Sequence, residues 1–508
     1  MEALIDLISQ EKEINELVKE LEAGNDRQLI AGLSGGAKSI LFKVLHQSID
    51  EPILIISPNL LQAQRTYEDL VKMLGDSLVH LYPAEELIAA DFSVSSYELR
   101  AQRIDTIDHM ARVGKGIYIT PIAGMKKLLP EKEQWLNSSL SAKIGEELNM
   151  SEWLVKLVSM GYTRQPMVTA PGEFALRGGI LDLYPLTMEE PVRIELFDTD
   201  IDSIRTFSAE DQRSTGKLEA VSILPASEFV WMNEDLTSIA GELEKALGVS
   251  LKKMKDAEAK ERLTINITSD IQLMREGSTP ENMMKYASFS GSTTSLESYF
   301  PSNGIVLFDE IGRILEVVSS LETEEKEWMV ALLEEGKIVH DASISISFEK
   351  MNALLKQRKI YFSLFIRTVP GIVVKRTVTF SCKPMQQFHG QMNLLKSEIE
   401  RWQQGKFNVF IVADGNERMQ KVQSILQDYD VSSAFSGKTS QSGGVIVIDG
   451  DLSAGFELPF QRIAVVTDSE LFKGKTKRKA RPQKLTNAER IKSYSEIKPG
   501  DHIVHVHH

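Results

Sequence analysis

The sequence has almost no cysteine, no long apolar run and no excess of positive charge. Its one cysteine, Cys382, excludes an internal disulfide and a cysteine-based zinc site. No apolar run approaches the roughly 18 residues of a membrane span, and the acidic N-terminus is unlike a secretory signal. The formal net charge of −14 argues against DNA coating by the whole surface, because phosphate binding needs clustered Lys and Arg. We therefore expect a cytoplasmic protein with no membrane partner and no metal site.

The composition is otherwise that of a globular protein, with 42% hydrophobic and 26% charged residues. A chain of 508 residues is expected to hold about three or four domains. Near the start, β-like runs at 52–57, 78–81 and 116–120 alternate with helical patterns, which predicts βαβ units and a parallel sheet. From about residue 137, short β-branched and aromatic segments between Gly, Pro and Asp turns predict an inserted antiparallel β domain.

The second half returns to α/β character and then changes sharply. The segment 353–475 alternates strands and helices, which predicts a second, small α/β domain. In 473–484, seven of twelve residues are Lys or Arg, so this segment is expected to be a solvated basic linker. A β pattern resumes at 493–508 and then stops. We expect a further domain to begin there and the chain to be a fragment.

The segment GLSGGAKS at 32–39 resembles a phosphate-binding loop but fails at one position. Gly32, Lys38 and Ser39 fit G-x-x-x-x-G-K-[ST], whereas Ala37 stands where the motif has its second glycine. In a working loop the Lys reaches the phosphates and the Ser binds Mg²⁺. A methyl group at Ala37 is expected to intrude where the chain turns most tightly and where only glycine is freely permissive.

The apolar run IVLF ends in Asp309 and Glu310, which resembles a Walker B segment that holds Mg²⁺. Alone this is a weak signal, because any buried strand can end in solvated acids. ATPases of the helicase type also need an arginine finger that a partner domain supplies. Residues 353–475 contain no arginine-rich helical segment that resembles the one in helicases. We favour a relic loop kept for packing over a live ATP site.

One longer stretch carries a more specific resemblance. Residues 161–214 (GYTRQPMVTAPGEF…), together with GLSGGAKS, YELRAQR and ILPASEF, resemble the N-terminal half of the bacterial transcription-repair coupling factors. The same stretch is similar to the excision-repair protein UvrB, with which that family shares an N-terminal module. The resemblance covers essentially the whole chain. It implies a degenerate, helicase-like P-loop domain in two pieces around the insert, with these boundaries: 1–136 and 223–352 for the first domain, 137–222 for the insert, 353–475 for the third domain, 476–492 for the linker and 493–508 for a truncated domain.

The resemblance also implies partners and cofactors. The insert would bind UvrA, and 493–508 would open the module that binds RNA polymerase. The ATP- and Mg²⁺-dependent DNA translocase of the family would lie beyond this chain, so we expect no cofactor and no catalytic residue here. In the family the N-terminal module has lost the nucleotide site that UvrB retains. About ten residues separate LYPAEE from YELRAQR, too few for the hairpin with which UvrB inspects DNA.

Strand alternation suggests where UvrA would bind. In VRIELF, Val192, Ile194 and Leu196 point one way, and Arg193, Glu195 and Phe197 point the other. A face with an arginine and an unexplained Phe opposite an apolar face is typical of a binding surface. The alternatives are a second small core around Phe197 and solvated charges.

The resemblance supports the binding interpretation and extends it. Arg177, Arg193 and Phe197 match the UvrA-contact residues of the family, and Arg164 matches a contact arginine of UvrB. Ala175 stands where UvrB has another arginine. We therefore expect a module that recruits UvrA to stalled RNA polymerase without hydrolysing ATP. The alternatives are a P-loop ATPase or UvrB-like helicase, and a DNA-binding protein that acts through the basic linker.

Overall fold

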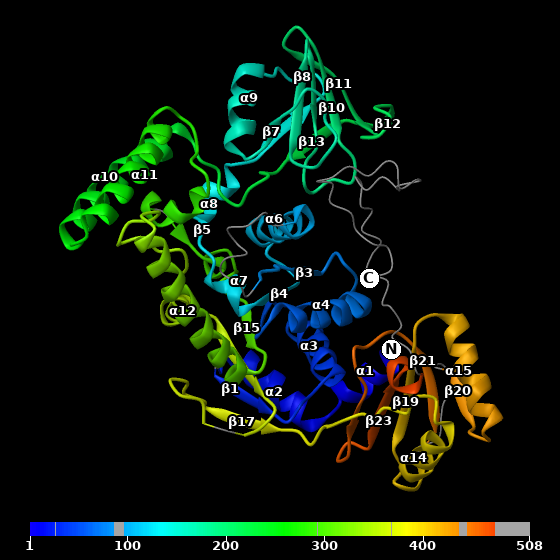
Figure 1. Ribbon diagram of the computed structural model, residues 1–508. Coiled ribbons are helices and arrows are strands. Elements are labelled where there is room, and N and C mark those ends of the chain that lie inside the picture. Colours follow the sequence, from blue (N-terminus) through cyan, green and yellow to red (C-terminus); the bar gives the residue numbers. More distant parts are fainter. Residues whose placement is uncertain (26, 86–95, 292, 367, 436–443, 473–508) are drawn as a thin grey trace, which may run out of the picture.

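The computed structural model describes residues 1–25, 27–85, 96–291, 293–366, 368–435 and 444–472 (Figure 1). These residues form a multidomain α/β structure with a parallel seven-stranded sheet, a mixed β-rich sheet and a second mixed α/β sheet. The expected basic linker and truncated domain lie outside the described residues, as do residues 87–95 between LYPAEE and YELRAQR. None of the helices in the described ranges is both long and apolar enough to cross a membrane.

The first domain is built on seven parallel strands in the order β17-β1-β16-β15-β2-β4-β3. Most of these strands are short apolar runs buried on both faces, as expected where helices cover both sides of a parallel sheet. The strands are β1 (Gln28–Ala31), β2 (Ile53–Ser57), β3 (Val79–Leu81), β4 (Ile117–Pro121), β15 (Ile305–Phe308), β16 (Arg358–Ser363) and β17 (Arg376–Thr379).

Helices surround this sheet, and several begin at a polar residue that caps them. The Asn59 side chain accepts a hydrogen bond from the backbone N–H of Gln62 at the start of α4, and Ser96 caps α6 in the same way. The helices of this part are α1 (Glu2–Ser9), α2 (Lys12–Glu22), α3 (Gly36–Ile49), α4 (Leu60–Leu74), α6 (Tyr97–Arg112), α7 (Ile122–Lys126), α8 (Lys132–Leu136), α12 (Ile311–Glu334) and α13 (Phe348–Leu354).

The first sheet continues beyond residue 352, where the sequence places the start of the third domain. Strand β16 lies between β1 and β15, and β17 pairs with β1 on the other side. The boundary at 352 is therefore wrong, and residues up to about 380 belong to the first domain. A short apolar strand does not reveal from its own sequence which sheet it will join, because its partners here, β1 and β15, are not its neighbours in the chain.

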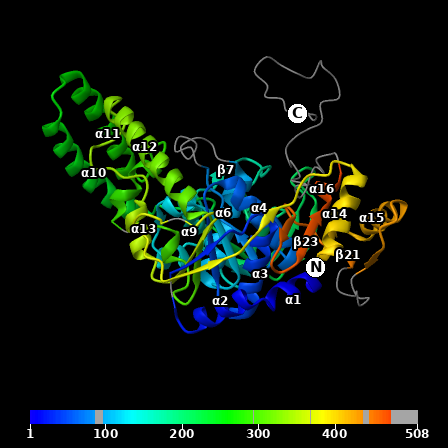
Figure 2. The same cartoon turned by 90° about the horizontal axis from the view of Figure 1, so that it is seen from below.

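A helical arm with its own apolar core extends from the first domain. Figure 2 shows α10 and α11 running side by side away from the sheet. The elements of this part are α10 (Asn233–Lys253), α11 (Ala257–Arg275), the 3-10 helices η1 (Met283–Ser290) and η2 (Leu296–Ser298), and the short strands β5 (Leu129–Pro130) and β14 (Thr293–Thr294).

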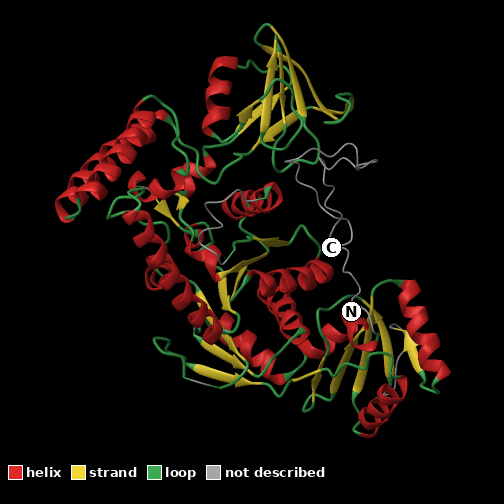
Figure 3. Ribbon diagram, in the orientation of Figure 1, coloured by secondary structure: helices red, strands yellow, loops and turns green. Residues whose placement is uncertain are grey.

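The insert consists of a six-stranded sheet, a two-stranded sheet of β6 and β13, and one helix, and strands predominate in it (Figure 3). Six strands lie in the order β12-β11-β10-β9-β8-β7. The sheet is mixed and not purely antiparallel as expected, because the two-residue strand β7 runs parallel to β8. The elements are β6 (Leu140–Lys143), α9 (Met150–Ser159), β7 (Thr163–Arg164), β8 (Glu173–Arg177), β9 (Ile180–Leu183), β10 (Val192–Phe197), β11 (Asp200–Phe207), β12 (Ser214–Leu218) and β13 (Ala220–Ile223).

The third domain has a six-stranded sheet in the order β18-β22-β23-β19-β21-β20. Four neighbouring strands are parallel, and β22 joins them antiparallel. The elements are β18 (Lys383–Pro384), α14 (Met392–Gln404), β19 (Asn408–Ala413), α15 (Asn416–Asp428), β20 (Ser433–Phe435), β21 (Val445–Asp449), β22 (Phe456–Leu458), β23 (Ile463–Thr467) and α16 (Asp468–Leu471).

Candidate functional site

Residues 32–39 comprise the loop between β1 and α3 and the first four residues of α3, and two of their glycines lie in the left-handed backbone region. These are Gly32 at φ +89° and Gly35 at φ +55°. A Cβ atom on Gly32 would lie 2.0 Å from the carbonyl oxygen of Phe380. Ala37 is the second residue of α3 and is not among the residues with positive φ. The expectation that Ala37 strains the backbone is therefore wrong, because a helical position accepts alanine readily.

Lys38 is bound by the two carboxylates that the sequence predicted as its neighbours. Its Nζ lies 2.6 Å from Oδ1 of Asp309 and 3.2 Å from Oε1 of Glu310. Burial alone would lower the pKa of the Lys38 ammonium, but the two carboxylates outweigh it and hold the pKa above its ordinary value. Asp309 also accepts a hydrogen bond of 2.5 Å from Gln62. The groups that would hold phosphate and Mg²⁺ are thus paired with one another.

Two further polar groups of residues 32–39, the Ser39 hydroxyl and the Gly36 N–H, are bound by protein atoms as well. The Ser39 hydroxyl donates to Oδ2 of Asp69 at 2.8 Å, and the Ser453 hydroxyl donates to the same oxygen at 2.7 Å. The N–H of Gly36 donates to the carbonyl oxygen of Ala454 at 3.2 Å. Sequence reasoning missed Asp69 of α4 and also Ser453 and Ala454 of the third domain, because no motif links these residues to residues 32–39.

The predicted surface lies on the insert, and the strand faces agree with the alternation in VRIELF. Val192 and Ile194 are fully buried, and Arg193 and Glu195 on the other face are partly exposed. The register against β11 shifts after Glu195, and Phe197, at the end of β10, is 78% exposed. The turns after Arg177 and after Phe197 lie at the same end of the sheet, because β8 pairs with β9 and β9 pairs with β10.

The two arginines of this face share one buried carboxylate that the sequence reasoning missed. Asp182 is fully buried and accepts one hydrogen bond from Arg177 at 2.6 Å and two from Arg193 at 2.7 and 3.0 Å. These bonds raise the pKa of Arg193 above its ordinary value. The Arg193 guanidinium also lies 4.6 Å above the ring of Phe207. The acid within the apolar run ILDL was the signal, but its cross-strand partner depends on register.

The structure brings Arg177 and Arg193 together at Asp182 and places Arg164 apart from them. The Arg177 side chain is 49% exposed, whereas that of Arg193 is only 16% exposed. Arg164 is exposed on the edge strand β7, level with Phe174, whose ring lies in the main core. A second small apolar core does exist on the face of the sheet that bears Arg193, but it does not include Phe197. Its buried members are Val168, Ala175, Tyr184 and Phe207.

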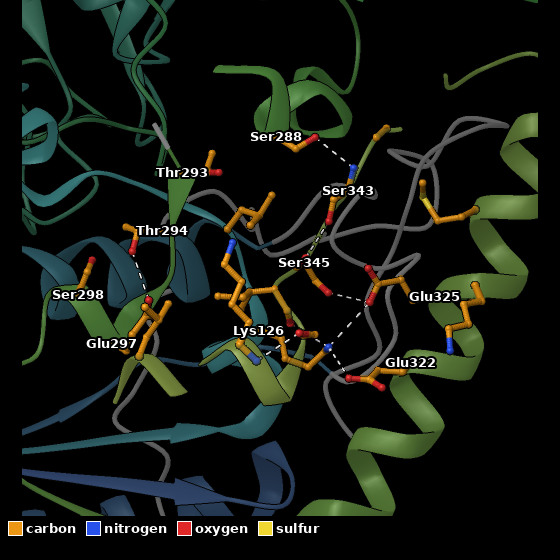
Figure 4. A pocket seen from close by; sticks show the side chains of 18 of the residues that line it. Lys126, Ser288, Thr293, Thr294, Glu297, Ser298, Glu322, Glu325, Ser343 and Ser345 are labelled. Atoms are coloured by element: carbon orange, nitrogen blue, oxygen red, sulfur yellow. Dashed lines mark hydrogen bonds and ion pairs between the residues drawn. The ribbon is translucent and has the colours of Figure 1, made fainter. Parts of the chain in front are cut away.

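A pocket of about 1120 Å³ lies against α12, away from both of these places (Figure 4). Its buried Lys126 donates to the carbonyl of Ile346 at 3.0 Å and lies 3.5 Å from Glu322 and 4.0 Å from Glu325. None of the predicted site residues lines it, so it supports neither prediction. In the described part of the chain, no group of three or more His, Cys, Asp or Glu side chains is arranged to hold a metal ion.

Residues 140–229, which begin at β6 and run past β13, match the family model of the UvrB interaction domain. The insert is therefore a domain of the UvrB interaction class. Over its whole length the chain is 43% identical to the transcription-repair-coupling factor of Bacillus subtilis (strain 168), covering 100% of this chain and 43% of the relative. It is 34% identical to that of Staphylococcus haemolyticus, covering 99% of this chain and 43% of the relative.

The chain spans less than half the length of these curated relatives. It corresponds to the N-terminal region, about 43%, of a transcription-repair-coupling factor, and this region contains the UvrB interaction domain.

Proposed function

We propose that this chain is the part of a transcription-repair-coupling factor that recruits UvrA to RNA polymerase stalled at a DNA lesion. One observation supports this most directly. On the domain that matches the UvrB interaction class, Phe197 is 78% exposed at the same end of the sheet as Arg177. An exposed aromatic ring near an arginine is typical of an interaction hot spot.

The predicted contact residues then divide into two kinds. Phe197, Arg177 and Arg164 are exposed enough to reach a partner directly. Arg193 is mostly buried between Asp182 and the Phe207 ring, so its main contribution is to orient the surface. Arg177 binds the same carboxylate, Asp182, which holds it in place while about half of its side chain stays exposed to solvent. Holding a long side chain in one orientation lowers the entropy cost of binding.

We also propose that the chain itself does not hydrolyse ATP. Lys38, Ser39 and the N–H of Gly36 are all bound by protein groups, which supports the relic interpretation over a P-loop ATPase. ATP and Mg²⁺ would serve the translocase in the rest of a complete relative. A cytoplasmic location, contact with RNA polymerase through 493–508 and contact with DNA elsewhere in the complete protein belong to the same proposal.

Capture of purified UvrA by the immobilised chain tests the recruitment proposal. Phe197→Ala and Arg177→Ala are expected to weaken capture at least about tenfold, as for hot-spot residues, and Asp182 keeps its two bonds from Arg193 in the second variant. Two matched controls should leave capture unchanged. Phe460→Ala removes a ring that is 81% exposed in the third domain, and Arg213→Ala removes a charged side chain that is 86% exposed elsewhere in the insert. Equal capture by all four variants would show that the surface is misplaced.

The two competing functions have their own measurements. Saturable, Mg²⁺-dependent binding of a fluorescent ATP analogue that Lys38→Ala abolishes would favour the ATPase. DNA binding that disappears on deletion of 473–484 and weakens steeply with salt would favour the DNA-binding alternative. We expect neither result.

A further inference from the structure

The first and third domains share one apolar core although their sheets are separate. Leu41 and Phe42 of α3 belong to the same buried cluster as Leu452 and Phe456 of the third domain. Helix α1 contributes to this cluster as well, and it lies beside the third sheet in both Figure 1 and Figure 2. The third domain is therefore packed onto the first and is not a separate body on a tether.

At this contact the loop between β21 and β22, residues 450–455, contacts residues 32–39, which are called the P-loop-like segment below. Leu452 is buried in the shared core. The backbone N–H and the hydroxyl of Ser453 both donate to Asp69, each at 2.7 Å, and Asp69 in turn accepts from Ser39. The carbonyl of Ala454 accepts from the N–H of Gly36 at the first turn of α3.

We propose that the 450–455 loop is an internal ligand of this segment, so that the third domain stabilises the first domain in the way that a bound nucleotide stabilises a P-loop protein. The N–H groups at a helix N-terminus attract negative groups, and here a carbonyl oxygen of Ala454 takes that place. A carbonyl carries only a partial charge and needs no counterion. Lys38 is correspondingly neutralised by Asp309 and Glu310.

The glycines of the segment fit this role. A Cβ atom on Gly36 would lie 2.5 Å from the carbonyl oxygen of Ala454, and one on Gly35 would lie 3.2 Å from the Cβ of Ala454. Gly36 is helical and its φ is not positive, so its backbone conformation does not require glycine. The close approach of the 450–455 loop does require it.

The substitution Gly36→Ala tests the proposal in the 508-residue chain. The new methyl group meets a backbone carbonyl, which cannot rotate away as a side chain can. We expect hydrogen exchange in residues 29–41 and 445–458 to accelerate roughly tenfold or more, because both sides lose a hydrogen-bonded contact. Ser453→Ala, which only removes a hydroxyl, should accelerate exchange in the same two segments to a smaller extent.

Gly241→Ala is the matched control. Gly241 is also helical and lies in α10, and a Cβ atom added to it would meet no other atom within 4 Å. This substitution should leave exchange in both segments unchanged. If Gly36→Ala and Ser453→Ala behaved like this control, the 450–455 loop would not be a ligand of the segment.

A nucleotide titration gives a second, independent readout. Ala37→Gly restores the consensus motif but leaves the 450–455 loop in place, so we expect no saturable binding of MgATP by this variant. Saturable MgATP binding by Ala37→Gly would overturn the proposal, because it would show that the segment is open to phosphate. This result is distinct from any loss of UvrA capture, which concerns the insert alone.

Discussion

The shared carboxylate of the insert makes Arg193→Ala a sharp test of the structure. Asp182 is fully buried and receives three hydrogen bonds, two of them from Arg193. The substitution leaves this charge with a single bond from Arg177 and removes the cation above Phe207. Removing one partner of a buried ion pair costs several kcal/mol, and because Arg177 remains we expect a loss of about 2–4 kcal/mol in local stability.

Native-state hydrogen exchange measures this loss directly in the insert. A change of about 2–4 kcal/mol corresponds to exchange that is roughly 30- to 700-fold faster in β8 to β11. Arg213→Ala is the control, since its side chain is 86% exposed and its removal should change exchange little. Adding Asp182→Ala to Arg193→Ala should recover part of the loss, because no buried charge is then left unpaired.

The reasoning is refuted if Arg193→Ala exchanges like Arg213→Ala, or if the double variant is less stable than the single one. The result also bears on binding experiments. A charge reversal at Arg193 would disturb the whole outer face of the sheet. Loss of UvrA capture by such a variant would therefore not identify Arg193 as a contact residue, whereas Phe197→Ala tests contact alone.

Three further predictions concern the first domain, each measured by urea unfolding. Lys38→Ala should lower its stability by about 2–4 kcal/mol, because it removes the cation that neutralises the buried Asp309; an unchanged midpoint would contradict this. Burial lowers the pKa of His80 to about 4 from 6.5, so the unfolded chain binds the proton more tightly and stability should fall as the pH drops from 6.5 to 4. His80→Phe should make stability less dependent on pH between 6.5 and 4. Burial alone would raise the pKa of Glu228, but Arg103 and other partners hold this pKa at about 2. The contribution of Glu228 to stability should therefore disappear as the pH falls from 4.5 to 2. Glu228→Gln should remove this dependence of stability on pH.

Much of the fold could be predicted from local patterns. The parallel sheet follows from short apolar strands alternating with helices, and the two faces of β10 follow from the period of two in VRIELF. The pairing of Lys38 with Asp309 follows from a loop and an apolar strand that have a known relation in P-loop folds. These features depend on residues close in sequence or on a motif whose geometry is general.

Other features depended on how distant strands and loops meet. The register of β9 against β10 decides that Asp182 lies between two arginines, and a one-residue slip would separate them. The assignment of β16 to the first sheet depends on β1 and β15, which lie far away in the chain. Local sequence contains no information on such pairings.

The sequence by itself determined that the insert has an apolar face and an arginine-bearing face, and that a loop after the first strand leads into a helix. Only the tertiary structure decided what these groups do. Arg193 is mostly enclosed because it binds the buried Asp182 and lies over the Phe207 ring, while Phe197 lies at the end of β10 and is exposed. Ala37 fits its helix without strain, and the segment is closed by Ala454 and Ser453, since the shared apolar core brings the third domain onto it.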